Sequence, residues 1–160
     1  MTINVGDHVP TAKMKQMTPE GMKDIDSAEF FKGKKVVLFA VPGAFTPTCS
    51  AKHLPGFVEK AGEIKSKGVD VIACLAVNDA FVMNAWGKDQ KAEGKVQMLA
   101  DGNGDFTRAV GLELDGSGYG LGKRSQRYAM IVQDGVVKAL HVEAPGKFEV
   151  SDADTMLKDL

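Results

Sequence analysis

The chain has 160 residues, of which 44% are hydrophobic, with 20 basic and 21 acidic side chains and a net charge of −1. This length suits a single domain, residues 1–160, that buries a sizeable core. The balanced charge gives no reason to expect nucleic acid or an anionic membrane as a partner, and no apolar run approaches a bilayer span.

The cysteine content bears on the compartment and on metal binding. Two cysteines are too few for a disulfide framework and fit a reducing compartment such as the cytoplasm, and the first residues show no secretory signal. Together with the three histidines they show no metal-ligand spacing, so no metal is expected.

The first part of the chain predicts a hairpin, a short helix and a buried strand. Strand-like residues 12–26 surround Thr18-Pro19-Glu20-Gly21, which has the composition of a turn. Ser27–Phe31 has the pattern of a short capped helix. Residues 36–41 are apolar on both faces, as in a central strand, and the run stops at Pro42-Gly43.

A helix and a second buried strand are expected next. After Cys49, apolar residues recur at the three- and four-residue steps of one helical face, at Leu54, Phe57, Val58, Ala61 and Ile64. Cys49 therefore lies in the first turn of a helix, and a bend is expected at Pro55. Residues 69–77 are again apolar on both faces, so strand, helix and strand predict a parallel βαβ unit.

Shorter elements fill the middle of the chain. Asn78-Asp79 starts a further helix, in which Trp86 has the spacing of a core residue and not of a ligand platform. Residues 96–99 predict a short strand and residues 106–110 a brief helix. The glycine-rich residues 111–124 do not match a nucleotide-binding fingerprint and are expected to form a mobile loop.

The last third predicts a hairpin and a closing helix. Residues 128–132 and 136–142 flank Asp134-Gly135, a strong hairpin signal. Residues 151–154 have the pattern of a capping box that begins a helix ending at Leu160. The whole pattern predicts an α/β fold, with a central mixed β-sheet flanked by helices on both faces.

Cys49 has the setting of a reactive thiol. A helix N-terminus presents unpaired N–H groups and the positive end of the macrodipole, which favour a thiolate. Thr46 and Thr48 supply hydroxyls to cap the helix or to donate to an anion. Thr46 stands where a C-x-x-C oxidoreductase has its first cysteine, so one activated thiol remains. The alternative, a structural buried cysteine, is disfavoured by this position.

Residues 42–50, PGAFTPTCS, closely resemble the active-site motif of the peroxiredoxins, in particular the type II group of plants and bacteria. The resemblance covers almost the whole chain and implies a thioredoxin-like fold, with the N-terminal hairpin as a peroxiredoxin addition. It implies that Cys49 attacks a peroxide and becomes a sulfenic acid, while Thr46 and a distant arginine orient the peroxide. The other residues of the active-site loop would be Pro42, Gly43 and Thr48.

Two arginines and a histidine are candidates for the surroundings of Cys49. From the residues alone, Arg124 and Arg127 are both interpreted as solvated surface charges. The resemblance implies that Arg127, immediately before a strand, is the active-site arginine, and it leaves Arg124 on the surface. His53 lies four residues after Cys49 on the same helical face. It is interpreted as a neighbouring polar residue that tunes access, outside the catalytic set.

Cys74 has two interpretations. It lies in the middle of a strand that is apolar on both faces, where a free cysteine usually acts as a small hydrophobe. The resemblance offers the alternative of a resolving cysteine, because some type II peroxiredoxins are assigned one on this strand. Others have one near the C-terminus, where residues 141–151 contain none. The structural interpretation is preferred.

These observations predict a thiol-dependent peroxidase that reduces hydrogen peroxide and alkyl hydroperoxides in antioxidant defence. The resemblance implies regeneration by glutathione with glutaredoxin, or by thioredoxin, and a homodimer. No cofactor is expected, because the oxidant is the substrate and sulfur carries the electrons. One alternative is a non-enzymatic redox sensor or holdase that uses the same reactive Cys49; another is a cysteine hydrolase.

Overall fold

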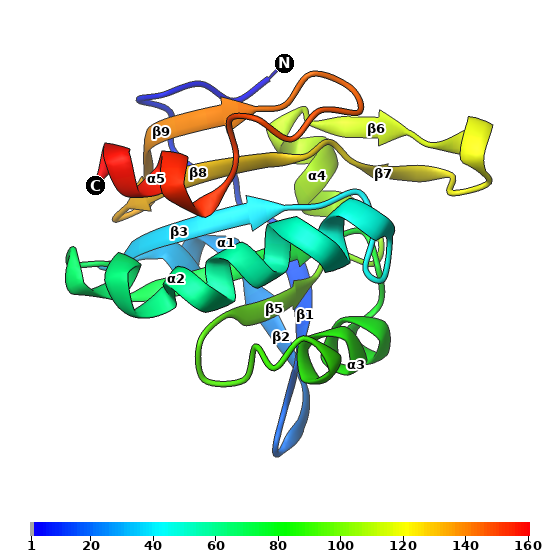
Figure 1. The fold of residues 1–160 in the computed structure, drawn as a ribbon, viewed down its shortest axis with the longest axis horizontal. Helices are drawn as coiled ribbons and strands as arrows, with labels where there is room; N and C mark the ends of the chain where they lie inside the picture. Colours follow the sequence, from blue (N-terminus) through cyan, green and yellow to red (C-terminus); the bar gives the residue numbers. More distant parts are fainter. Residues whose placement is uncertain (1) are drawn as a thin grey trace.

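The computed structural model describes residues 2–160. Its main feature is a mixed seven-stranded sheet in the order β2-β1-β5-β4-β3-β8-β9 (Figure 1). The central strands β3, β4 and β5 are parallel, and the outer neighbours pair antiparallel. The strands are β1 (Lys13–Thr18), β2 (Gly21–Asp26), β3 (Lys35–Ala40), β4 (Val71–Ala76), β5 (Gln97–Ala100), β8 (Tyr128–Gln133) and β9 (Val136–Val142).

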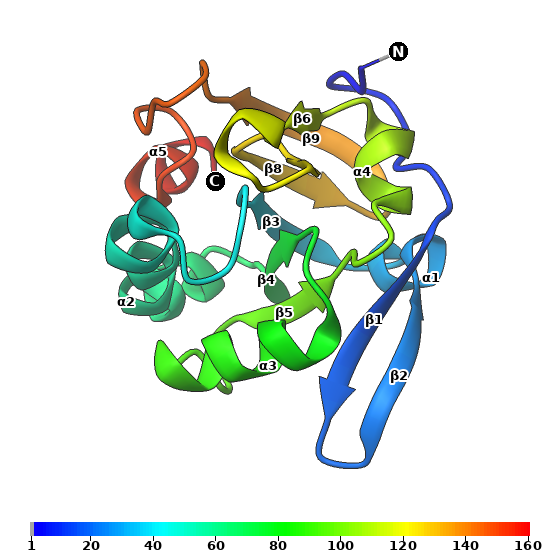
Figure 2. The ribbon, with the colours of Figure 1, turned by 90° about the vertical axis from the view of Figure 1, so that its right-hand side faces the viewer.

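Helices cover both faces of this sheet, as the sequence predicts. Helices α2, α3 and α5 lie on one face and α1 and α4 on the other (Figure 2). One hydrophobic core joins the sheet to the first set, and a second core joins it to the other set. None of the helices in residues 2–160 is both long enough and apolar enough to span a bilayer. The helices are α1 (Ser27–Phe31), α2 (Leu54–Ser66), α3 (Ala80–Asp89), α4 (Asp105–Val110) and α5 (Ala153–Asp159).

Strand β3 lies between the two cores, which explains its unbroken apolar sequence. Val37 and Phe39 belong to the core under α2, and Val36 and Leu38 belong to the core under α4. All four side chains are fully buried. A strand with solvent on neither face gains from apolar residues at every position, so it shows no alternation. The β3–α2–β4 unit is parallel, as expected.

The expectation of a mobile loop at residues 111–124 is wrong. These residues form a small second sheet from β6 (Glu113–Asp115) and β7 (Lys123–Ser125), which projects from one end of the molecule (Figure 1). A 3-10 turn, Ser117–Tyr119, connects the strands, and Gly120 and Gly122 have φ angles of 72° and 70° that suit glycine. The glycines therefore shape a hairpin whose strands are too short to give a sequence period.

The closing helix also differs in its start. Helix α5 begins after Asp152, whose side chain makes no capping hydrogen bond to the helix backbone, so the expected capping box is absent. The carbonyl of Ser151 is instead bonded to His53, at a distance of 2.9 Å from Nε2. The segment before α5 is therefore organised by contacts with the rest of the fold.

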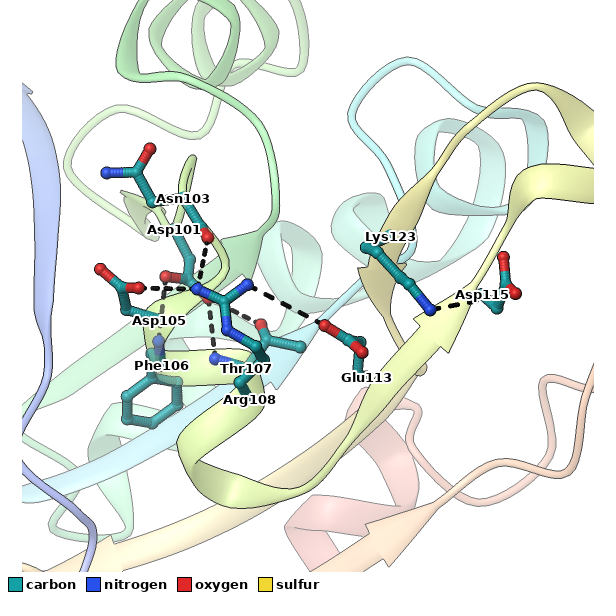
Figure 3. Close-up of polar contacts among 9 residues, drawn as sticks. All are labelled: Asp101, Asn103, Asp105, Phe106, Thr107, Arg108, Glu113, Asp115 and Lys123. Atoms are coloured by element: carbon teal, nitrogen blue, oxygen red, sulfur yellow. Dashed lines mark hydrogen bonds and ion pairs between the residues drawn. The ribbon is translucent and has the colours of Figure 1, made fainter.

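Asp101 organises the start of α4 from the end of β5. It is 1% exposed, and its carboxylate accepts hydrogen bonds from the Phe106 N–H (3.1 Å), the Thr107 N–H (2.8 Å) and the Thr107 hydroxyl (2.7 Å). Figure 3 shows this cluster beside the exposed ion pair of Arg108 with Asp105, whose nitrogen and oxygen are 2.7 Å apart. The buried carboxylate thus satisfies donors at a helix start that water does not reach.

We expect Asp101→Ala to lower the free energy of unfolding by about 3 kcal/mol, because it strands buried donors. Asp105→Ala, which breaks only the exposed ion pair, should cost less than about 1 kcal/mol. Urea unfolding of both variants and the wild type measures the two losses. Equal losses would contradict this account of α4.

Candidate active site

Cys49 lies where the loop after β3 becomes a helix, as the sequence predicts. The Ser50 N–H donates to the Thr46 carbonyl at 2.9 Å and closes the first turn. Residues Cys49–His53 then form a π-helical segment, η1, in which the Leu54 N–H donates to the Cys49 carbonyl. Only Leu54 separates this wider π-helical segment from Pro55, which has no N–H to donate. Single π turns of this kind are frequent at functional sites.

The register of the sheet brings Arg127 to Cys49. Ala40, the last residue of β3, pairs with Tyr128, the first residue of β8. Arg127 directly precedes Tyr128 and so lies beside the loop that leads from β3 to Cys49. Its Nη2 donates to the Cys49 sulfur at 3.1 Å, and Cys49 itself is fully buried. Arg127 thus places a fixed positive charge in direct contact with the buried sulfur.

Thr46 has a different hydrogen-bonding role from the one expected. Its hydroxyl donates to the Gly43 carbonyl at 2.7 Å, so its proton is engaged by the loop backbone. Thr48 makes no capping bond to η1. Because a hydroxyl has one proton and two lone pairs, the Thr46 oxygen is left as an acceptor. It can therefore receive a hydrogen bond from a substrate O–H.

Arg124 is not the solvated surface charge that the sequence suggests. The residue is half-buried, its Nη1 donates to the Pro42 carbonyl at 3.4 Å, and its Nε donates to the Leu121 carbonyl at 3.0 Å. A Cβ atom on Gly43 would lie 2.8 Å from Arg124 Nη1, so a side chain at this position would displace the guanidinium. Arg124 thus contacts the active-site loop through the Pro42 carbonyl.

His53 is bonded to the active-site arginine, which the sequence did not indicate. It is fully buried and accepts a hydrogen bond at Nδ1 from Nη1 of Arg127, at 2.9 Å. It is a polar neighbour of Cys49, as expected, but its contacts are with Arg127 and the core and not with solvent, and a role in tuning access stays a prediction. Its spacing from Cys49 gave a signal, but the partner is 74 residues away in the chain.

Cys74 lies on β4 beside Phe39 of β3, and it shares the core that contains Cys49. It is fully buried, and both cysteines are free in residues 2–160. Burial raises the pKa of the Cys74 thiol well above its usual value, the nearby Cys49 sulfur adds to this, and Arg127 opposes it. Cys74 is thus a poor nucleophile in this conformation.

Trp86 supports the same helix from α3. Its ring is fully buried, as its spacing predicts, and its indole N–H donates to the Ser50 hydroxyl at 3.0 Å. The residue next to Cys49 is thereby tied to a neighbouring helix.

Within residues 2–160, no group of three or more histidine, cysteine, aspartate or glutamate side chains is arranged to hold a metal ion.

The comparisons with known proteins all place the chain in the same family. The family model described as Redoxin matches residues 4–157. The sequence is 53% identical to peroxiredoxin-2E, chloroplastic, of Arabidopsis thaliana over 163 residues, which cover 99% of this chain and 70% of that protein. It is 51% identical to peroxiredoxin-2B of the same plant over 159 residues, 99% of this chain and 98% of that one.

A solved structure agrees with these sequence matches. The structure described as reduced Prx3 in complex with H2O2, from Vibrio vulnificus, is 58% identical and superposes with a TM-score of 0.95 over 98% of both chains. The thioredoxin-like peroxiredoxin fold implied by residues 42–50 is thereby confirmed. The chain belongs to the Redoxin family, among its peroxiredoxins, and is a thiol-dependent peroxidase with an antioxidant function.

Proposed function

We propose that the Cys49 thiolate attacks the O–O bond of hydrogen peroxide or an alkyl hydroperoxide. One oxygen joins the sulfur to give a sulfenic acid, and the other takes up a proton and leaves as water or an alcohol. The observation that carries this proposal is the 3.1 Å hydrogen bond from Arg127 Nη2 to the Cys49 sulfur. That contact places a fixed positive charge at the point where the sulfur attacks the substrate oxygen.

Thr46 and Arg127 hold the peroxide in this proposal. The Thr46 oxygen has lone pairs free, because its proton is donated to Gly43, and it accepts the peroxide O–H. Arg127 donates to the oxygen on which charge develops as the O–O bond breaks. Pro42, Gly43 and Thr48 shape the loop around the substrate. These contacts align the O–O bond with the sulfur.

An external thiol restores Cys49 in this scheme. Cys74 is buried and its thiol pKa is raised by that burial, so it is disfavoured as the resolving residue. We propose glutathione with glutaredoxin as the reductant, with thioredoxin as the second choice. We also propose a homodimer, a cytoplasmic location that fits two unpaired cysteines, and no cofactor.

The alternative of a redox sensor or holdase is less well supported. It accounts for a reactive Cys49, but the relatives that match the whole chain are peroxiredoxins. A peroxide-consumption assay with a continuous thiol supply tests the proposal directly. Many turnovers per protein support the peroxidase, and a single oxidation without turnover would favour the sensor.

We expect Cys49→Ser to reduce peroxide consumption to below a few per cent of the wild-type rate, because a serine hydroxyl stays protonated at neutral pH. The fold should be retained, since the change keeps the side-chain shape. Peroxide loss is followed spectroscopically, with circular dichroism as the folding control. Substantial remaining turnover would show that Cys49 is not the nucleophile.

Arg127→Ala should slow the reaction of Cys49 with hydrogen peroxide by more than about tenfold, through loss of a donor to the developing charge. Arg127→Lys should fall between that variant and the wild type, because it keeps the charge and loses the planar fork. Stopped-flow kinetics measures the rates. Arg108→Ala, on the exposed side of α4, is the control. Wild-type rates in both Arg127 variants would remove Arg127 from the site.

Cys74→Ser should keep most activity when glutathione and glutaredoxin supply the electrons. Its cost should be a loss of about 1–2 kcal/mol in unfolding free energy, because a hydroxyl enters an apolar core. Mass spectrometry of the wild type after one equivalent of peroxide should show one added oxygen on Cys49. A dominant species two hydrogens lighter, with both cysteines blocked, would instead identify Cys74 as the resolving cysteine.

A further inference from the structure

Arg127 is fixed at two points, one on its backbone and one on its side chain. Its backbone carbonyl accepts from the Glu143 N–H at 2.9 Å, which extends the pairing of β8 with β9 by one residue. At the other end, Nη1 donates to Nδ1 of His53 at 2.9 Å. Nη2 is then the nitrogen that donates to the Cys49 sulfur.

His53 is held in the tautomer that can accept a hydrogen bond from Arg127. Its Nε2 is 2.9 Å from the Ser151 carbonyl, which can only accept, so Nε2 carries the proton and Nδ1 is free to accept. The ring packs against Phe39 and Phe148, with centroid distances of 4.8 Å and 4.9 Å. The neutral ring therefore has one acceptor, and that acceptor faces the guanidinium.

The electrostatics of His53 agree with this geometry. Burial and the positive charge of Arg127 lower the pKa of His53 to about 3, against the opposing effects of the Ser151 hydrogen bond and the carboxylates of Glu143 and Asp152. The imidazole is therefore neutral near neutral pH. A protonated ring would have no lone pair for Arg127 and would repel it.

Glu143 fixes the carbonyl to which His53 is bonded. Its side chain is buried, and one oxygen accepts from the Val150 N–H (2.9 Å), the Ser151 N–H (2.8 Å) and the Ser151 hydroxyl (2.7 Å). Both of its oxygens are 2.9 Å from the N–H of Glu149. Burial acts to raise the pKa of Glu143, but these hydrogen bonds outweigh it and hold the pKa below its usual value. An ionised carboxylate thus sets the position of Ser151.

We propose that His53 and Glu143 are positioning residues for Arg127, joined to it in a closed ring of hydrogen bonds. The ring runs from the Arg127 carbonyl to Glu143, from Glu143 to Ser151, from Ser151 to His53, and from His53 back to the Arg127 side chain. This inference rests on the proposed role of Arg127 in peroxide reduction. The ring sets the rotation of the guanidinium, so that Nη2 points at the sulfur and the substrate.

This closed circuit of hydrogen bonds predicts an effect on the reaction with peroxide that a purely structural role of His53 would not produce. Loss of the His53 acceptor frees the guanidinium to turn, which weakens the alignment of the peroxide more than it weakens the reactivity of the sulfur. Alkylation by iodoacetamide needs the thiolate but no oriented O–O bond. The ratio of the peroxide rate constant to the iodoacetamide rate constant therefore reports the position of Arg127.

The test compares this ratio in the wild type, His53→Phe and Glu143→Gln. His53→Phe keeps an aromatic ring against Phe39 and Phe148 and removes both nitrogens. Glu143→Gln keeps the side-chain size and replaces one acceptor oxygen by a donor group. We expect the ratio to fall by about tenfold or more in His53→Phe and by a smaller factor in Glu143→Gln.

His141→Phe is the matched control, because His141 lies on β9 and is bonded to Asp159, on the surface and outside the ring. Its ratio should equal that of the wild type. Unchanged ratios in folded His53→Phe and Glu143→Gln would overturn the inference and leave the peroxidase intact. A wild type that consumes no peroxide would instead overturn the proposed function.

The pH dependence of folding gives a second readout for His53. Because its pKa is about 3 in the folded chain and 6.5 is its ordinary value, unfolding takes up a proton between these limits. Wild-type stability should therefore fall with falling pH, by up to about tenfold in the folding equilibrium constant per pH unit below about pH 6. Urea unfolding of His53→Phe should lack this contribution, whereas His141→Phe should retain it. Equal pH dependence in the wild type and His53→Phe would contradict a neutral, buried His53.

Discussion

The hydrogen bond from Arg127 to the Cys49 sulfur is the contact on which the site depends. The two residues are 78 positions apart, and neither helix nor loop alone brings them together. The antiparallel register of β3 and β8 does so, because Ala40 and Tyr128 are partners at the ends of their strands. A shift of that register by one residue would turn Arg127 to the other face of the sheet. The two apolar cores that fix the register are therefore also what places the charge beside the sulfur.

The complete burial of Cys49 affects which oxidants and which reductants can reach its sulfur. Because its sulfur is fully buried, Cys49 is reached more readily by a small peroxide than by bulky oxidants and electrophiles. The same burial limits the approach of a reductant thiol to the oxidised sulfur. The π segment at Cys49–His53 is the irregular part of this helix, and Trp86 and Ser50 tie it to α3. Reactivity towards peroxide and access for the reductant thus place opposite demands on one short segment.

Much of the fold follows from sequence patterns, and much of the site's detail does not. Residues 36–41 and 69–77 were readable as central strands because each is buried on both faces, and Cys49 was readable at a helix start because apolar spacing begins after it. Strands β6 and β7 gave no such signal, since three residues are too few to show a period. Arg124 and His53 could not be assigned from the sequence, because their partners are distant in the chain and are set by tertiary packing.

The most direct test of the central claim is where, and how fast, sulfenic acid forms. Wild-type protein is mixed with one equivalent of hydrogen peroxide, the sulfenic acid is trapped with dimedone, and the labelled peptide is identified by mass spectrometry. The account predicts label on Cys49 and none on Cys74, formed faster than on a free cysteine thiolate by a factor on the order of 10² or more. Label on Cys74, or a rate no greater than that of the free thiolate, would contradict it.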